Sequence, residues 1–262
     1  MNAVVVRACS AAQLGLRQQE LAGFERRFEY PLGRDHFHID HGSDYLAFFR
    51  ALGEPFPFVA ESAQGIVGVL IAVKKRTARG PVWYLCDLKV SPLSERGLGQ
   101  RLLASWARAH LEPNAAAFGV SMNAADGSNR MARVARRCPA AGVVATTEVV
   151  LFSFDHATWL RVASTVEREL GAVAFFDPRG TKDIVLASTG QPLPLLHAQH
   201  GPFARPRVGP ARKDHTHMLC LPRTDSLVGT LAERGATPNA SATVLHRAMP
   251  QFDWRHLLTS DI

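Results

Sequence analysis

The first 154 residues alternate between two periods of hydrophobic and polar positions. Runs rich in β-branched and aromatic residues predict strands at 3–9, 56–61, 65–75, 81–90, 118–122 and 142–154. Apolar residues three or four positions apart predict helices after Ser10, after Ser43, over 97–110 and over 126–137. The polar stretch 30–43 predicts a loop, and a Ser-Ala-Gln-Gly turn predicts a hairpin between the second and third strands.

The order of these elements is β-α-α-β-β-β-α-β-α-β. Antiparallel strands come first and a β-α-β-α-β segment comes last. This order predicts an α/β fold with a mixed central sheet and helices on both faces of that sheet.

The rest of the chain predicts a smaller α/β region. It contains predicted helices at 158–170 and 225–233, strands at 172–176, 183–187, 217–221 and 242–249, and a long loop at 189–214. The strand-helix-strand order at 217–249 repeats that of 118–154. A degenerate duplication of half of the first domain explains the repeat, and so does chance, because this order is common. We expect a domain at 1–154 and a C-terminal extension at 155–262.

Composition and charge narrow the class of protein. The 262 residues are 47% hydrophobic and 20% charged, as in ordinary globular proteins. The longest apolar run, 65–73, is about half of a ~20-residue membrane span. Arg7 and Gln13 interrupt any signal-peptide core, so we expect neither secretion nor a membrane span. The net charge of +7 favours anionic ligands. Four well-separated cysteines without a CxxC pair indicate reduced thiols in a cytoplasm.

The most informative segment is 88–103, Leu-Lys-Val-Ser-Pro-Leu-Ser-Glu-Arg-Gly-Leu-Gly-Gln-Arg-Leu-Leu. A strand ends, a turn with two glycines follows, and an apolar helix begins. The first backbone amides of such a helix lack intrahelical partners and form an anion site. The segment lacks Gly-Lys-Ser/Thr and a third glycine, so it is neither a Walker A loop nor a dinucleotide fingerprint. A tight turn with good helix packing is the alternative interpretation.

This segment resembles the acyl-CoA-binding motif of the GNAT superfamily of N-acetyltransferases. The family pattern is a Leu-x-Val strand end, a Pro turn, and Arg/Gln-x-x-Gly-x-Gly/Ala opening a helix. Here it stands as Ser94-Glu95-Arg96-Gly97-Leu98-Gly99, with Ser94 departing from the pattern. The order of elements over 3–154 is similar to that of the family, as is a helix containing Asn129 after the next strand.

The resemblance implies acetyl-CoA, or another acyl-CoA, as co-substrate, with no metal. Its arm would lie between the strands 81–90 and 118–122, and backbone amides would hold its pyrophosphate and polarise its thioester. The implied cofactor-binding residues are Leu88, Lys89, Val90, Glu95, Arg96, Gly97, Leu98, Gly99, Gln100, Arg101 and Asn129. Only one such glycine loop occurs, so we expect one cofactor site, with the extension packing on or shaping the acceptor side.

The implied reaction moves the acyl group to a primary amine of a small molecule or peptide by direct attack. The alternative is a catalytically silent GNAT-like module that binds acyl-CoA in regulation or as a scaffold. Relatives often carry a tyrosine seven residues after the helix asparagine, where this chain has Arg136. That substitution and Ser94 favour the alternative.

The attacking amine must lose a proton, and Asp87 is the predicted general base. Relatives carry a glutamate in the preceding position, which is Cys86 here. The structural alternative is that Asp87 pairs with Lys89 or caps a backbone group. Relatives place their acceptor-binding helix and loop near 30–45, so the candidate acceptor residues are Tyr30, Asp35, His36, Asp40 and Tyr45.

Two other features suggest less specific chemistry. The histidines at His36-x-His38, His197-x-x-His200 and His215-x-His217 lie on predicted loops without a cysteine, so we expect solvated or hydrogen-bonded side chains, not zinc ligands. The basic segment 205–213 has no interleaved aromatic residues, so we expect a solvated loop and no nucleic acid partner. The sequence does not assign an oligomeric state.

Overall fold

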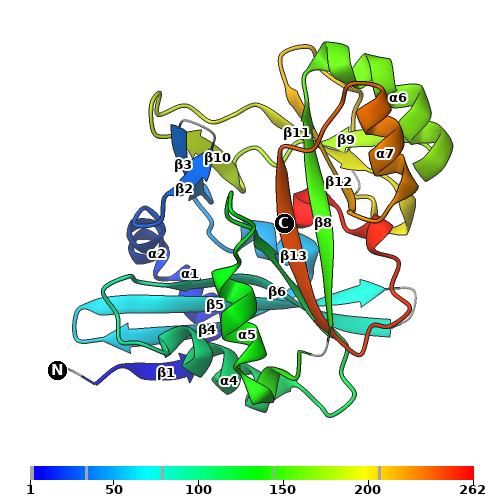
Figure 1. The fold of residues 1–262 in the computed structure, drawn as a ribbon. Helices are drawn as coiled ribbons and strands as arrows, with labels where there is room; N and C mark the ends of the chain where they lie inside the picture. The colour runs from blue at the N-terminus through cyan, green and yellow to red at the C-terminus, as the bar shows by residue number, and fades with distance from the viewer. Residues whose placement is uncertain (1–2, 33–34, 78–79, 144, 206–207) are drawn as a thin grey trace.

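A ten-stranded sheet runs through the computed structural model of the chain, which describes residues 3–32, 35–77, 80–143, 145–205 and 208–262 (Figure 1). In spatial order its strands are β1 (Val5–Ala8), β4 (Glu54–Ser62), β5 (Gly65–Thr77), β6 (Gly80–Val90), β7 (Ala117–Met122), β13 (Ala240–Arg247), β8 (Ala145–Phe154), β12 (Thr216–Pro222), β11 (Leu195–Gln199) and β9 (Ala174–Phe176). The strands predicted at 56–61, 65–75, 81–90, 118–122 and 142–154 are therefore present.

The predicted hairpin and the strand after it form the antiparallel core of the first half. Phe58 of β4 lies opposite Leu70 of β5, and Leu70 lies opposite Leu88 of β6. The strands β6 and β7 are parallel, and their pairing extends only from Trp83–Leu85 to Ala117–Gly119. Beyond Leu85 the two strands separate, and this separation creates a cleft.

Helices cover both faces of this sheet, as the sequence predicts. The helices α1 (Ala11–Gly15), α2 (Gln18–Glu25) and α3 (Ala47–Leu52) share one hydrophobic cluster with Val69 and Ile71. The helix α4 (Leu98–His110) and the helix α5 (Arg130–Arg136) share another with Leu70 and Ala72. Alternate side chains of β5 thus point to opposite faces, which explains why β5 is apolar throughout instead of alternating.

The C-terminal half continues the same sheet. The helices α6 (His156–Leu170) and α7 (Ser226–Glu233) pack on β8 and β12 in a third hydrophobic cluster. The last strand, β13, lies between β7 and β8 and is antiparallel to both (Figure 1). A segment of the predicted extension therefore lies inside the sheet of the first half.

The two halves repeat one strand pattern around the central pair β13–β8. On one side lie the parallel strands β6 and β7, and on the other side lie the parallel strands β11 and β12. The helix α5 follows β7 and leads into β8, while α7 follows β12 and leads into β13. The recurrence of strand, helix and strand noted in the sequence thus has a spatial counterpart, in which each half contributes a strand beside the other.

Two predictions of loops are wrong. The stretch 30–43 contains β2 (Tyr30–Leu32) and β3 (Asp35–Asp40), which form a small sheet with β10 (Asp183–Leu186). The stretch 189–214 contains β11. Besides the local pairing of β2 with β3, the strand β3 pairs with the distant β10, and β11 pairs with β9 and β12, so local composition carries little signal of these strands.

Helix boundaries also differ locally from the predictions. The helix after Ser10 has the predicted capping box with Gln13 but is divided into α1 and α2 near Arg17. The helix predicted from 126 begins at Arg130, because Asn129 caps it. Short 3₁₀ turns are present at Pro139–Ala141, Gly201–Phe203, Trp254–His256 and Thr259–Asp261. No helix in the described ranges is long and apolar enough to cross a membrane.

Candidate active site

The cleft between β6 and β7 has a volume of about 320 Å³. Its walls are mostly apolar and come from both strands and from the helices α4 and α5, including Leu88, Leu103, Trp106, Phe118, Val120 and Met131. Tyr30, Asp87 and Lys89 line it near α2, and His246 and Arg247 line it from β13. The cleft is therefore mostly apolar, with ionisable groups at two places in its wall.

A glycine loop connects β6 to α4. Gly97 adopts φ +85°, a left-handed conformation that disfavours other residues, and precedes the first turn of α4. The first intrahelical bond runs from the Arg101 N–H to the Gly97 carbonyl at 3.0 Å. The amides of Leu98, Gly99 and Gln100 precede that bond and lack intrahelical acceptors; that they bind an anion stays a prediction.

The two arginines near this loop differ in whether their guanidinium groups are free to contact an anion. Arg101 forms an ion pair with Glu95 and donates to the Val4 carbonyl at 2.8 Å, so its guanidinium is engaged within the protein. Arg96 is exposed beside the glycines. The backbone amides and Arg96 are therefore better placed to meet an anion than Arg101.

Asn129 fastens the end of β7 to the start of α5. Its Oδ1 accepts from the Ala132 amide at 2.8 Å, and its Nδ2 donates to the Ser121 carbonyl at 2.9 Å and to Asn123 Oδ1 at 2.8 Å. These bonds orient the strand that lines the cleft. A direct contact between Asn129 and a ligand stays a prediction.

Asp87 belongs to a buried cluster with Glu25, Tyr45 and Lys89. The Lys89 ammonium donates to Glu25 Oε1 at 2.5 Å and to Asp87 Oδ2 at 3.1 Å. The Tyr45 hydroxyl lies 3.0 Å from Asp87 Oδ2 and 3.4 Å from Glu25 Oε2. The pairing of Asp87 with Lys89, the structural alternative, is thus present. Both contacts of Asp87 use Oδ2, and Oδ1 has no hydrogen-bond partner among the described residues.

Burial and charge oppose each other in this cluster. Burial raises the pKa of Glu25, and the attraction of Lys89 only partly offsets this. Burial disfavours the charged form of Lys89, but Asp87 and Glu25 outweigh it and raise the lysine pKa. Burial also raises the pKa of Tyr45, as do the nearby charges of Asp87 and Glu25. Lys89 is therefore the cation that permits two carboxylates to lie together inside the protein.

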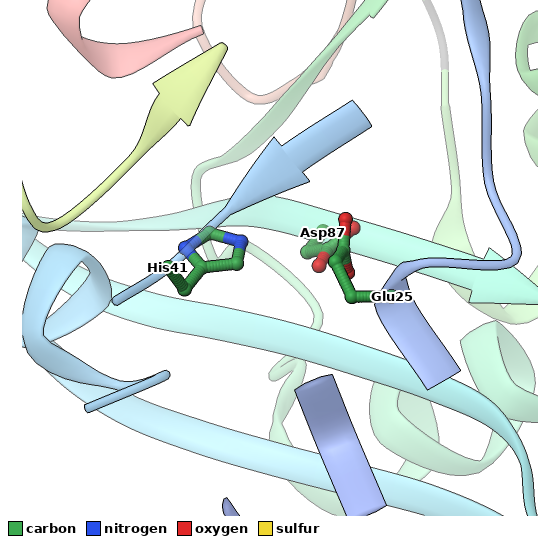
Figure 2. Close-up of side chains that lie close together, drawn as sticks. All are labelled: Glu25, His41 and Asp87. Carbon is green, nitrogen blue, oxygen red and sulfur yellow. The ribbon is translucent and has the colours of Figure 1, made fainter. Parts of the chain in front are cut away.

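His41 approaches the same cluster from the segment after β3 (Figure 2). Its Nδ1 lies 3.2 Å from the Thr181 carbonyl, which can only accept, so Nδ1 carries the proton and Nε2 a lone pair. Burial, and to a smaller extent the nearby charge of Lys89, lowers the pKa of His41 to about 4. Its Nε2 is buried without a partner in the described part of the chain.

Nε2 of His41 and carboxylate oxygens of Glu25 and Asp87 lie within 4.8 Å of one another (Figure 2). Imidazole and carboxylate are donor types that bind divalent metals. The position between the two carboxylates is held by the Lys89 ammonium, however. The geometry therefore describes an ion cluster whose cation belongs to the chain.

A second pocket of about 300 Å³ lies beside α2, on the other side of the cluster. Glu25, Tyr45, His41 and Asp40 line it. Glu25 and Tyr45 therefore separate this polar pocket from the apolar cleft that Asp87 and Lys89 line.

The predicted acceptor residues fall into two groups. Tyr30 lines the cleft, Tyr45 contacts Asp87, and Asp40 lines the second pocket. Asp35 and His36 lie at the other end of β3, where Asp35 bonds to Ser188. The structure brings only the first group near the cleft.

Sequence reasoning missed Glu25, His41 and Lys182. Glu25 supplies the second carboxylate that the strand position of Cys86 lacks. Lys182 lies 4.5 Å from the Phe48 ring, and burial together with the repulsion of Lys89 lowers its pKa to about 8. Only their burial distinguishes these three residues from other polar residues in the same segments. Burial is not visible in the sequence, so the sequence carried no signal of their roles.

The C-terminal segment, residues 254–262, fills the opening between β11 and β12. Thr259 Oγ1 lies 3.0 Å from His197 Nδ1 on β11 and 3.3 Å from the Met218 carbonyl on β12. Gln199 donates to Ser260 Oγ at 3.0 Å. In the second half, the C-terminal segment thus lies against the parallel strands β11 and β12. In the first half, the parallel strands β6 and β7 have a cleft in the corresponding place.

The same segment also joins the two halves. Asp261 is 3% exposed and pairs with Lys75 of β5 and with Arg205 of the second half. The Tyr84 hydroxyl on β6 donates to the Asp261 carbonyl. The extension therefore packs on the first half at these contacts, and whether it shapes the acceptor side stays a prediction. Of the basic segment 205–213, residues 206–207 lie outside the described part.

Comparisons with known proteins identify the fold. No model of a known protein family matches the chain, and no curated protein sequence matches it. Among solved structures, a tandem GNAT protein from the clavulanic acid biosynthesis pathway is 10% identical, with a TM-score of 0.52, over 95% of this chain and 100% of that one. A putative acetyltransferase from Pyrococcus horikoshii is 8% identical, with a TM-score of 0.49, over 97% of this chain and 92% of that one.

The match with the tandem protein extends over both halves of the chain and so includes its mixed sheet. The chain has the GNAT fold.

Proposed function

We propose that the chain is an acyl-CoA-dependent N-acyltransferase that uses acetyl-CoA and a primary amine. The observation that carries the proposal is the apolar cleft between β6 and β7, together with the amides at the start of α4, the helix that supplies Leu103 and Trp106 to the wall of the cleft. A ligand with an extended apolar arm and a pyrophosphate matches both parts of this site. The GNAT fold agrees with such a ligand.

The proposed binding mode uses mainly the backbone. The arm of the co-substrate lies between the separated strands, and its pyrophosphate accepts from the amides at 98–100, with Arg96 beside it. Backbone amides near Leu88 and Val90 polarise the thioester carbonyl and stabilise the oxyanion that forms on attack.

Asp87 is the proposed base. Its Oδ1 is free to accept a proton from the acceptor amine, while Oδ2 is fixed by Lys89 and Tyr45. The neutral amine attacks the thioester carbon directly, and the departing thiolate takes a proton through water. Tyr30, which lines the cleft, is the proposed acceptor-side residue, while Tyr45 is buried in the cluster and Asp40 lines the second pocket.

One co-substrate per chain is expected. The second pair of separated parallel strands is filled by Leu257–Asp261, which bond to both of its edges. The free thiols agree with a cytoplasmic setting, where they would stay reduced.

A silent acyl-CoA-binding module is the second candidate. The observation that favours it is the Lys89 ammonium on Asp87, because a carboxylate with a bound cation is a weaker base. In this case the chain would bind acetyl-CoA without transferring the acyl group.

Calorimetry with acetyl-CoA tests binding, and thiol release with a panel of primary amines tests turnover. Gly97→Glu should abolish binding, because it places a charged side chain in a left-handed position at the anion site. Gly190→Glu is the matched control, since Gly190 also has a positive φ but lies in an open turn of the second half. Equal affinities of the two variants would refute the site, and binding without turnover would select the silent module.

A further inference from the structure

The cluster around Tyr45 forms the wall between two pockets of different character. Asp87 and Lys89 face the apolar cleft, while Glu25 and Tyr45 face the polar pocket beside α2. Tyr45 is 1% exposed and Glu25 is 2% exposed, so neither meets bulk solvent outside these pockets. A proton that moves between the two pockets at this point must pass through the side chains of Tyr45 and Glu25.

Hydrogen bonds connect Asp87, Tyr45 and Glu25 without a gap across this wall. The Tyr45 oxygen lies 3.0 Å from Asp87 Oδ2 and 3.4 Å from Glu25 Oε2, so one small rotation of the O–H moves its bond from one carboxylate to the other. The Lys89 ammonium donates to Glu25 Oε1 and to Asp87 Oδ2, and so holds both carboxylates in place. The two acids are thus fixed on either side of one hydroxyl.

The proposed reaction releases a proton where water has little access. An acceptor that arrives as an ammonium must lose one proton before it attacks, and the arm of the co-substrate would fill the apolar cleft. The polar pocket beyond the wall has room for water and offers the unpartnered Nε2 of His41 as an acceptor.

We propose that Tyr45 and Glu25 carry this proton from Asp87 to the polar pocket. The inference rests on the proposed acyltransferase function. Asp87 takes a proton from the ammonium on Oδ1, and a turn of its carboxyl group brings this O–H to the Tyr45 oxygen. The Tyr45 oxygen accepts that proton while its own hydroxyl proton moves to Glu25 Oε2. Tyr45 ends unchanged, and Glu25 releases the proton to water in the pocket. The amine then attacks, and its second proton ends on the departing thiolate.

The surrounding ionisable groups agree with the movement of the proton from Asp87 to Glu25. Besides the three path residues, the titratable groups near the cluster are Lys89, Tyr30, His41 and Lys182. Burial raises the pKa of Glu25, so its carboxylate takes up a proton more readily than an exposed one. Lys89 is a positioning residue, because its ammonium holds the two carboxylates together and is not itself a station on the path.

Tyr45→Phe tests the path, because it removes the hydroxyl and keeps the ring. The assay compares the acceptor found in the amine panel with a fluorinated analogue of it whose amine is neutral at pH 7. With the ammonium acceptor we expect kcat to fall roughly 10²-fold with KM little changed. With the neutral analogue the variant should match the wild type, since no proton must leave before attack.

Tyr84→Phe is the matched control. Tyr84 is also 1% exposed, and its hydroxyl donates to the Asp261 carbonyl, away from the path. Glu25→Gln, which keeps the shape of the side chain, should reproduce the pattern of Tyr45→Phe and replaces it if that variant does not fold.

The outcomes separate the two proposals. Equal loss with both acceptors, or a pattern shared with Tyr84→Phe, would overturn the proton path and leave the acyltransferase standing. A wild-type chain that binds acetyl-CoA but turns over no amine would overturn the acyltransferase, and the path would fall with it.

Discussion

Replacing Lys89 by Met removes the cation from a buried cluster of three charges. Its side chain is 8% exposed, and those of Glu25 and Asp87 are 3% and 10% exposed. The substitution leaves two carboxylates together without their counter-ion. Removing one partner of a buried ion pair costs about 3–5 kcal/mol, because the remaining charge stays desolvated. For a chain of this size that corresponds to roughly 6–20 °C in melting temperature.

The pH dependence of the free energy of unfolding gives a sharper test than the loss of stability at a single pH. Without Lys89 the pKa of Glu25, already raised by burial, rises further. A carboxyl whose folded pKa is raised stabilises the fold only when protonated, and this contribution disappears as pH rises through the folded pKa. The destabilisation by Lys89→Met should therefore be smaller at pH 5 than at pH 7.5.

Urea unfolding of the wild type and the variant at both pH values measures this difference. Arg223→Gln is the control, because Arg223 pairs with Glu148 at 2.7 Å on the surface, with side chains 53% and 41% exposed. Its loss should stay below about 1 kcal/mol at either pH. A Lys89→Met variant as stable as the control, or one with the same loss at both pH values, would refute the argument.

Three further predictions follow from other parts of the structure. Burial lowers the pKa of His197 to about 3, so the fold holds it neutral; its stabilising contribution is present above about pH 6.5 and falls by up to ~1.4 kcal/mol per pH unit below that. His197→Gln should flatten the acid side of the stability profile, and an unchanged slope would contradict this. Asp225 caps α7 through the Leu227 amide at 2.9 Å and pairs with Arg255 at 2.9 Å, so Asp225→Ala should cost about 2 kcal/mol in thermal unfolding, and Asp225→Asn less. Calorimetry should find one acetyl-CoA per chain, and two would show that the C-terminal segment leaves the second opening accessible.

Local sequence was sufficient for the elements whose stability depends on neighbours in the chain. The runs of β4, β5 and β6 are apolar and joined by short turns, so their pairing requires little loop closure. The capping box of Ser10 and Gln13 and the left-handed Gly97 before α4 were also predictable, because each satisfies groups within a few residues. These features carried the resemblance to the GNAT superfamily.

The candidate site was only partly predictable. Asp87 and the glycine loop lie on one continuous segment and were found from it. Glu25 is 64 residues from Lys89 in the chain, and only the packing of α2 on the sheet brings the two together. The roles of Glu25, His41 and Lys89 depend on burial, because the same side chains in water would have ordinary pKa values and weak mutual attraction.

The sequence by itself determined the period of each element, the hairpins between adjacent strands and the anion loop, since these arise from contacts between residues close in the chain. Only the tertiary structure decided that β13 enters the sheet between β7 and β8, that β10 pairs with β3, and that Tyr84 holds Asp261 from 177 residues away. A strand with a polar or short sequence gains its stability from the partner it pairs with. Which partner is available is a property of the whole fold, and that is why the second half was the harder half to predict.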